Sequence, residues 1–98
     1  FDITNEEQIK SALSEFHKNH PPISGLVNNA GISKDQIVLR LKKSDIQQTI
    51  ETNLIGAINL TSILSRQFLK TSNVSIVNIS SVVGLMGNAS QISYSASK

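Results

Sequence analysis

The sequence predicts an α/β fold in which helices flank a parallel sheet. Two short apolar runs, residues 23–27 and 74–79, are bounded by turn residues and are typical of strands. Apolar residues recur at helical spacing before the first run and again between the two runs. Because strands and helices alternate and the connections are of crossover length, we expect the strands to lie parallel in one domain.

The composition excludes several classes of protein. With 98 residues, 39% hydrophobic and 16% charged, the chain fits one small soluble globular unit. The net charge of +2, without a basic cluster interleaved with aromatic residues, gives no support for a nucleic-acid partner. No apolar run approaches the roughly 18 residues of a membrane span. Since the chain has no cysteine and only two histidines, we expect neither a disulfide nor a metal site.

The first predicted helix follows Phe1–Thr4, which is typical of a strand end leading into a helix. Thr4 and Glu7 have the spacing of a capping box, and Pro21 with Pro22 ends the helix. Its apolar face would pack on the sheet and consists of Ile9, Ala12, Leu13 and Phe16.

The first predicted internal strand is Ile23–Val27, which ends at the sequence Asn28-Asn29-Ala30-Gly31. Gly31 permits a turn that other residues would strain. For residues 32–43 we expect a polar connection with a short helical piece. A strand end followed by two asparagines and a glycine is a candidate ligand edge.

The longest predicted element is a helix from Ser44 to about Lys70, with Ser44 and Gln47 as a second capping box. Val74–Ile79 follows as a strand. Its apolar run is continuous rather than alternating, so we expect both faces of this strand to be covered.

The last stretch carries the candidate chemistry. Tyr94 and Lys98 are four residues apart, so a helix would place them one turn apart on one face. A neighbouring ammonium favours a phenolate and lowers the pKa of a phenol, which then serves as a general acid or base. Ser81 follows the predicted strand Val74–Ile79, and its hydroxyl would be directed at the same reacting oxygen.

This set of residues in this order resembles the short-chain dehydrogenase/reductase family over essentially the whole chain. The resemblance implies a Rossmann-like, doubly wound, three-layer α/β/α domain of which residues 1–98 are the central part. It implies that Tyr94 is the catalytic acid, that Lys98 assists it and bonds the nicotinamide ribose, and that Ser81 holds the substrate oxygen. It also implies a catalytic role for Asn53, whose backbone would help to hold a water.

The resemblance further implies a nicotinamide cofactor, with NADPH expected and NADH left open. The residues expected beside the cofactor, in addition to Tyr94 and Lys98, are Asp2, Ile3, Asn28, Ala30 and Gly31. The family's glycine-rich turn for the pyrophosphate does not occur in these residues, nor does a substrate-closing segment. We therefore expect the chain to be part of a longer protein and not to fold or turn over alone.

Within the family, the chain is most similar to the β-ketoacyl-acyl-carrier-protein reductases of fatty acid synthesis. This implies reduction of a 3-oxoacyl thioester, with Gln91 beside the substrate. Ser90 and Asn73 depart from the pattern, because those enzymes usually have glycine at both places. The basic residues that could meet an acidic carrier protein are Lys34, Arg40, Lys42, Lys43 and Lys70.

Alternatives to this interpretation remain open. One is a reductase or dehydrogenase of another carbonyl or alcohol, such as a steroid, sugar or quinone. Another is a non-catalytic scaffold of the same fold. By resemblance we expect a homo-oligomer, most simply a tetramer. The compartment stays open, with the cytoplasm or an organelle matrix (mitochondrion or plastid) expected for a soluble enzyme of this kind.

Overall fold

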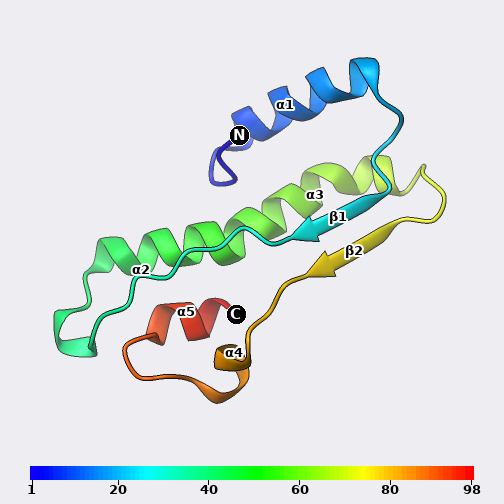
Figure 1. Cartoon of the computed structure of the whole chain (residues 1–98). Coiled ribbons are helices and arrows are strands. Elements are labelled where there is room, and N and C mark those ends of the chain that lie inside the picture. The colour runs from blue at the N-terminus through cyan, green and yellow to red at the C-terminus, as the bar shows by residue number, and fades with distance from the viewer.

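The computed structural model describes all 98 residues, from Phe1 to Lys98 (Figure 1). The elements, in chain order, are α1 (Glu6–Asn19), β1 (Gly25–Asn28), the 3₁₀ turn η1 (Val38–Arg40), α2 (Lys43–Ile50), the π turn η2 (Glu51–Ile55), α3 (Gly56–Phe68), β2 (Ser75–Asn78), α4 (Val82–Met86) and α5 (Ile92–Ser97). From Glu6 onward the predicted order of helices and strands is confirmed, and so is the short helical piece between residues 32 and 43. The strand end predicted at Phe1–Thr4 is not observed, because the sheet contains only β1 and β2 and these residues form a turn. The helix α4 was not predicted.

The two strands lie side by side and parallel, as predicted. Gly25 pairs with Ser75 and Asn28 with Asn78, so both strands end at the same level. The crossover between them runs through α2, η2 and α3, which form one long helical rod beside the strands (Figure 1). Asn28 and the segment after Asn78 therefore meet at one edge of the sheet.

The hydrophobic core lies on one face of this sheet. Ile9 from α1, Leu26 from β1, and Leu60 and Leu64 from α3 are buried together. Side chains alternate along a strand, so Val27 and Val77 point to the opposite face, where 58% and 48% of their surfaces are exposed. The prediction that Val74–Ile79 is covered on both faces was therefore wrong for this chain. Its helices supply only one of the two helical layers of the predicted fold.

Both predicted capping boxes were wrong. Asn5, not Thr4, caps α1, because its Oδ1 accepts a hydrogen bond from the Gln8 N–H at 3.0 Å. Thr4 lies one residue before this capping position, and its N–H and its hydroxyl both donate to Asp2 Oδ1, at 2.9 and 2.8 Å. In α2, Ser44 already lies inside the helix, and the capping position is Lys42, whose side chain makes no capping bond.

The long helix predicted from Ser44 to Lys70 is confirmed as a continuous helical run, Lys43–Phe68, with one irregular turn. In η2 the Gly56 N–H bonds the Glu51 carbonyl, five residues earlier, instead of the usual fourth. The wider turn places Asn53 on the side of the rod that faces the loops after β1. Such π turns in α-helices often occur at functional sites.

Two residues other than glycine have left-handed backbone conformations. They are Asn73, with φ of 56°, and Ser90, with φ of 65°. These are the two positions at which the sequence departs from the expected glycines. Asparagine tolerates this conformation through its short polar side chain, whereas serine has no comparable advantage.

We therefore predict that Ser90→Gly stabilises the protein by about 1 kcal/mol, because it removes the steric cost of a left-handed L-residue. Asn73→Gly is the matched comparison, and it should raise the free energy of unfolding by less than Ser90→Gly does. Urea denaturation of the protein and of both variants measures the two differences. A loss of stability in Ser90→Gly would contradict the backbone assignment at this position.

Candidate active site

Tyr94 and Lys98 lie on one face of the C-terminal helical turn, as their spacing predicted. Tyr94 is in α5 and Lys98 directly follows it, and the Lys98 ammonium lies 6.0 Å from the centroid of the Tyr94 ring. Both side chains are half-buried. The cation is thus close enough to the phenol for its charge to act on it.

Lys98 is fixed from the exit of β2. Its Nζ donates to the Ile79 carbonyl at 2.8 Å, and its own carbonyl accepts from the Ser80 hydroxyl at 2.8 Å. A methyl group added to Gly84 would lie 2.4 Å from the Lys98 carbonyl carbon, so only glycine permits this close approach. An ammonium has three N–H donors, and two remain after the bond to Ile79.

Tyr94 and Lys98 share one cavity of about 370 Å³, which we call the Tyr94 cavity. The loop after β1, the exit of β2 and the start of α5 contribute to its wall. The lining residues are Asn29, Gly31, Ile32, Ser33, Ile79, Ser80, Gln91, Tyr94 and Lys98. Three of the predicted site residues, Gly31, Gln91 and Tyr94, therefore meet here together with Lys98.

Ser81 lies next to this group, but its side chain does not line the cavity. Its hydroxyl oxygen accepts a hydrogen bond from the Val83 N–H at 3.2 Å and so caps α4. The capping bond uses a lone pair of the oxygen and leaves the O–H donor available. Ser80, which was not predicted as a site residue, lines the cavity instead.

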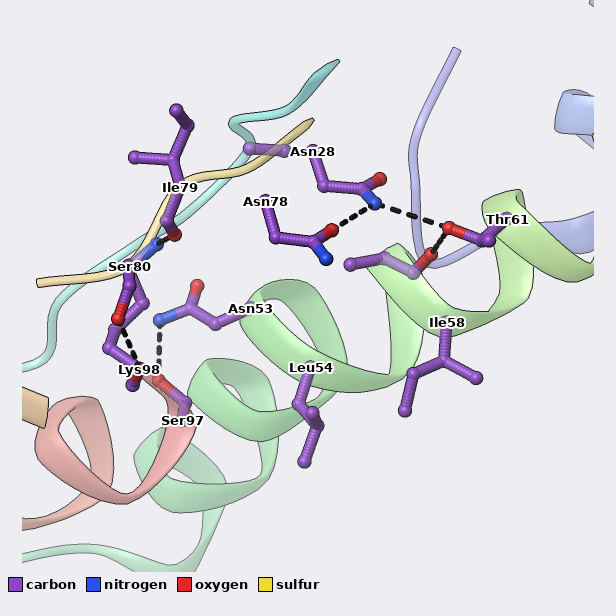
Figure 2. A pocket seen from close by; sticks show the side chains of 12 residues that line it. Asn28, Asn53, Leu54, Ile58, Thr61, Asn78, Ile79, Ser80, Ser97 and Lys98 are labelled. Atoms are coloured by element: carbon purple, nitrogen blue, oxygen red, sulfur yellow. Dashed lines mark hydrogen bonds between the residues drawn. The ribbon is translucent and has the colours of Figure 1, made fainter. Parts of the chain in front are cut away.

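A second cavity, the strand-end cavity, of about 380 Å³, lies on the other side of Lys98, between the strand exits and the helical rod (Figure 2). Asn28, Ala30 and Asn53 line it, and Lys98 and Ser80 belong to both cavities. The Asn28 Nδ2 donates to Asn78 Oδ1 at 2.8 Å and to Thr61 Oγ1 at 3.1 Å. These bonds tie the ends of the two strands to each other and to α3.

Asn28 keeps one unused group. Its Oδ1 is buried without a hydrogen-bond partner, although only 8% of the residue is exposed. A buried acceptor of this kind is rare in proteins and favours a donor from outside these contacts.

Asn53 makes three hydrogen bonds through its side chain and is only 7% exposed. Its Oδ1 accepts from the Ile32 N–H at 2.7 Å, and its Nδ2 donates to the Ile32 carbonyl at 2.8 Å and to Ser97 Oγ at 2.9 Å. The residue therefore joins the π turn, the loop after β1 and α5. The structure thus shows a structural role for the Asn53 side chain, while the backbone role stays a prediction.

Asp2 and Ile3 lie apart from the other predicted residues. Hydrogen bonds from the Thr4 N–H and then from its hydroxyl lower the pKa of the exposed Asp2 carboxyl. Asp2 lines a separate polar cavity of about 570 Å³ beside α2 and η2. The Ile3 side chain is partly buried and packs against the core and Gly56.

The comparison with known families identifies this arrangement. The model of the family described as short chain dehydrogenase matches residues 1–98. The chain belongs to this family. The resemblance drawn from Ser81, Tyr94 and Lys98 is thereby confirmed at the level of the family.

Among relatives of this short chain dehydrogenase, the 3-oxoacyl-[acyl-carrier-protein] reductase FabG of Thermotoga maritima is 41% identical over 97 residues. These residues are 99% of the chain and 39% of the relative, so the chain spans about two fifths of that relative's length.

Two solved structures show the same fold. A putative gluconate dehydrogenase from Agrobacterium tumefaciens has 29% identity and a TM-score of 0.93. The match covers 99% of the present chain and 38% of the dehydrogenase chain. A tyrosine-to-phenylalanine variant of ElxO with NADPH bound has 33% identity and a TM-score of 0.90. The match covers 99% of the present chain and 40% of the ElxO chain. Rossmann-type topology is therefore established for these residues.

Sequence analysis missed several polar residues that surround the two cavities. Ser80, Ser33, Asn78 and Thr61 line one or both of them. Asn78 could have been found, because a polar residue at the end of an apolar strand is unusual. No local signal distinguishes Ser33 or Thr61 from other surface hydroxyls.

No group of three or more histidine, cysteine, aspartate or glutamate side chains is arranged to hold a metal ion. None of the helices combines the length and the apolar character needed to cross a membrane.

Proposed function

We propose that this chain carries the catalytic residues of an oxidoreductase that reduces a 3-oxoacyl thioester on an acyl carrier protein, with NADPH as the hydride donor. The observation that carries the proposal is that Tyr94 and Lys98 line one cavity at the carboxyl ends of β1 and β2. In open α/β sheets, ligands bind outside this edge.

The residues present fit a nicotinamide cofactor. Lys98 has two free N–H donors for ribose hydroxyls, and its ammonium is held in place by the Ile79 carbonyl. Gly31 leaves open space beside it, since an added methyl group would lie 3.7 Å from Lys98 Nζ. Asn28 and Ala30 would line the cofactor from the strand end, and Asp2 and Ile3 would lie beside the adenine. When bound, the nicotinamide supplies a hydride to the substrate's carbonyl carbon.

The chain's own side chains then act on the carbonyl oxygen. The Tyr94 hydroxyl would donate a hydrogen bond to it and polarise the C=O bond. Ser81, whose side chain caps α4 outside the Tyr94 cavity, would donate a second hydrogen bond after turning toward the cavity. As the carbon accepts a hydride, the oxygen takes the phenolic proton of Tyr94, and the product is an alcohol. The Lys98 ammonium stabilises the phenolate that remains, until solvent returns a proton.

The substrate assignment is supported by the 41% identical relative, which is named as a 3-oxoacyl-[acyl-carrier-protein] reductase. NADPH is supported by the ElxO structure, which holds that cofactor. We also propose that residues 1–98 are the central part of a larger domain, whose other segments supply the pyrophosphate site and cover the exposed sheet face at Val27 and Val77. A homotetramer is proposed from the family alone.

A second candidate is a dehydrogenase of a small hydroxylated substrate that uses the same Tyr94 and Lys98. The observation in its favour is the fold match to a putative gluconate dehydrogenase. The reaction is the same in reverse, because oxidation of an alcohol needs Tyr94 as a base.

A substrate panel tests the proposal. The complete protein, with the segments that flank residues 1–98, is assayed with NADPH and with NADH against acetoacetyl and longer 3-oxoacyl thioesters and a simple ketone, and with NADP+ and NAD+ against a sugar acid. We expect the highest kcat/KM for a 3-oxoacyl thioester with NADPH. A higher kcat/KM for oxidation of the sugar acid would favour the second candidate, and the absence of any turnover by the complete protein would refute both.

A further inference from the structure

A polar cluster at the rim of the Tyr94 cavity has no role in the mechanism above. Gln91 donates from Nε2 to Ser33 Oγ and to Asp35 Oδ1, each at 3.4 Å. On its other side, Gln91 Oε1 accepts from Asn88 Nδ2 at 2.7 Å. Ser33 also donates its hydroxyl to Asp35. A backbone bond of 2.9 Å from the Gln36 N–H to the Ser90 carbonyl holds the two loops together.

The donors and acceptors in this cluster fix the direction of the Gln91 amide. An ionised carboxylate only accepts hydrogen bonds, so Asp35 requires the NH₂ group of Gln91 on its side. The Gln91 oxygen must then face Asn88, whose NH₂ group satisfies it. A reversed amide would place two acceptors together at Asp35 and two donors together at Asn88.

This fixed amide has a consequence for the substrate. Gln91 and Ser33 both line the Tyr94 cavity, so the Gln91 NH₂ group lies at the cavity rim. Because Ser33 Oγ and Asp35 Oδ1 are in contact with each other, one N–H of this group can serve both of them, which leaves the other N–H for a ligand. The rim therefore offers a donor at a second point, away from the hydroxyl of Tyr94.

We infer that Asp35 and Asn88 are positioning residues that orient Gln91 to bind a second acceptor oxygen of the substrate. This inference rests on the proposed function and deepens it. The site then prefers a compound with two carbonyl groups, one reduced at Tyr94 and the other held by Gln91. A 3-oxoacyl thioester has this pair, with a single CH₂ between the ketone and the thioester carbonyl.

Two variants with opposite changes of charge test the inference. Asp35→Asn keeps the size of the side chain but permits the Gln91 amide to reverse. Asn88→Asp adds an acceptor on the other side and draws the Gln91 NH₂ group away from the rim. Since all of these residues but Gln91 are exposed, neither change should prevent folding, and thermal denaturation checks this.

For both variants, we expect KM for acetoacetyl-N-acetylcysteamine to rise by about three- to tenfold, the effect of one lost hydrogen bond, with kcat within about twofold. KM for 2-octanone, which has one carbonyl, should not change. Equal changes for the two substrates, opposite effects of the two variants, or no change would overturn the inference and leave the proposed function standing. Failure of the unmodified protein to reduce either compound would refute both.

Discussion

Tyr94→Phe is expected to lower kcat for reduction of a 3-oxoacyl thioester by at least about a hundredfold, the typical contribution of a general acid. The change removes one oxygen atom and keeps the ring. The Tyr94 hydroxyl makes no hydrogen bond within the structure, so its loss leaves no partner unsatisfied. The affinity for the cofactor should fall only slightly, because Lys98 still offers its two free donors.

The control for this prediction is the thermal stability of the same variant, which should equal that of the unmodified protein. Steady-state kinetics with saturating NADPH measures kcat, and fluorescence titration measures cofactor binding. If Tyr94→Phe retained more than about a tenth of the activity, another residue would have to supply the proton.

Asn53→Asp should have the largest effect on stability, with a loss of about 3 kcal/mol. The substitution keeps the shape of the side chain but removes both N–H donors. The Ile32 carbonyl would lose its donor, and a carboxylate would face that carbonyl at a site with 7% exposure. Ser97 Oγ would lose the hydrogen bond that it accepts and keep only the one that it donates to the Tyr94 carbonyl. The loop that carries Gly31 and Ser33 would then lose its link to the C-terminal end of α5 through Asn53.

Asn59→Asp is the matched control, since Asn59 lies in α3, one and a half turns further on, and makes no side-chain hydrogen bond. We expect it to change the free energy of unfolding by about 0.5 kcal/mol or less. Chemical denaturation of both variants gives the comparison. Equal losses would show that the three bonds of Asn53 do not hold the loop and α5 together.

Features that depend on neighbours in the sequence were predicted correctly. Because Tyr94 and Lys98 are four residues apart, they lie on the same face once a helix forms there. The apolar runs predicted the strands, and the long crossover predicted that they are parallel.

Two kinds of feature were not predicted correctly: which of two adjacent residues caps a helix, and which distant residues contact an element. Thr4 has the right spacing for a cap but binds Asp2 instead, which leaves Asn5 as the cap. The apolar run of β2 shows that the strand can be buried on both faces, but not which segments cover it. The bonds from Asn53 to Ile32 and Ser97 join residues 21 and 44 positions away, and no local pattern indicates them.

The central claim is that the phenol of Tyr94 and the ammonium of Lys98 form one site with a nicotinamide cofactor. A crystal structure of the protein with NADPH bound tests this most directly. We predict that the nicotinamide ribose lies within hydrogen-bonding distance of Lys98 Nζ and that the nicotinamide ring lies in the Tyr94 cavity. A cofactor bound with its nicotinamide ring outside that cavity, or without contact to Lys98, would contradict the account.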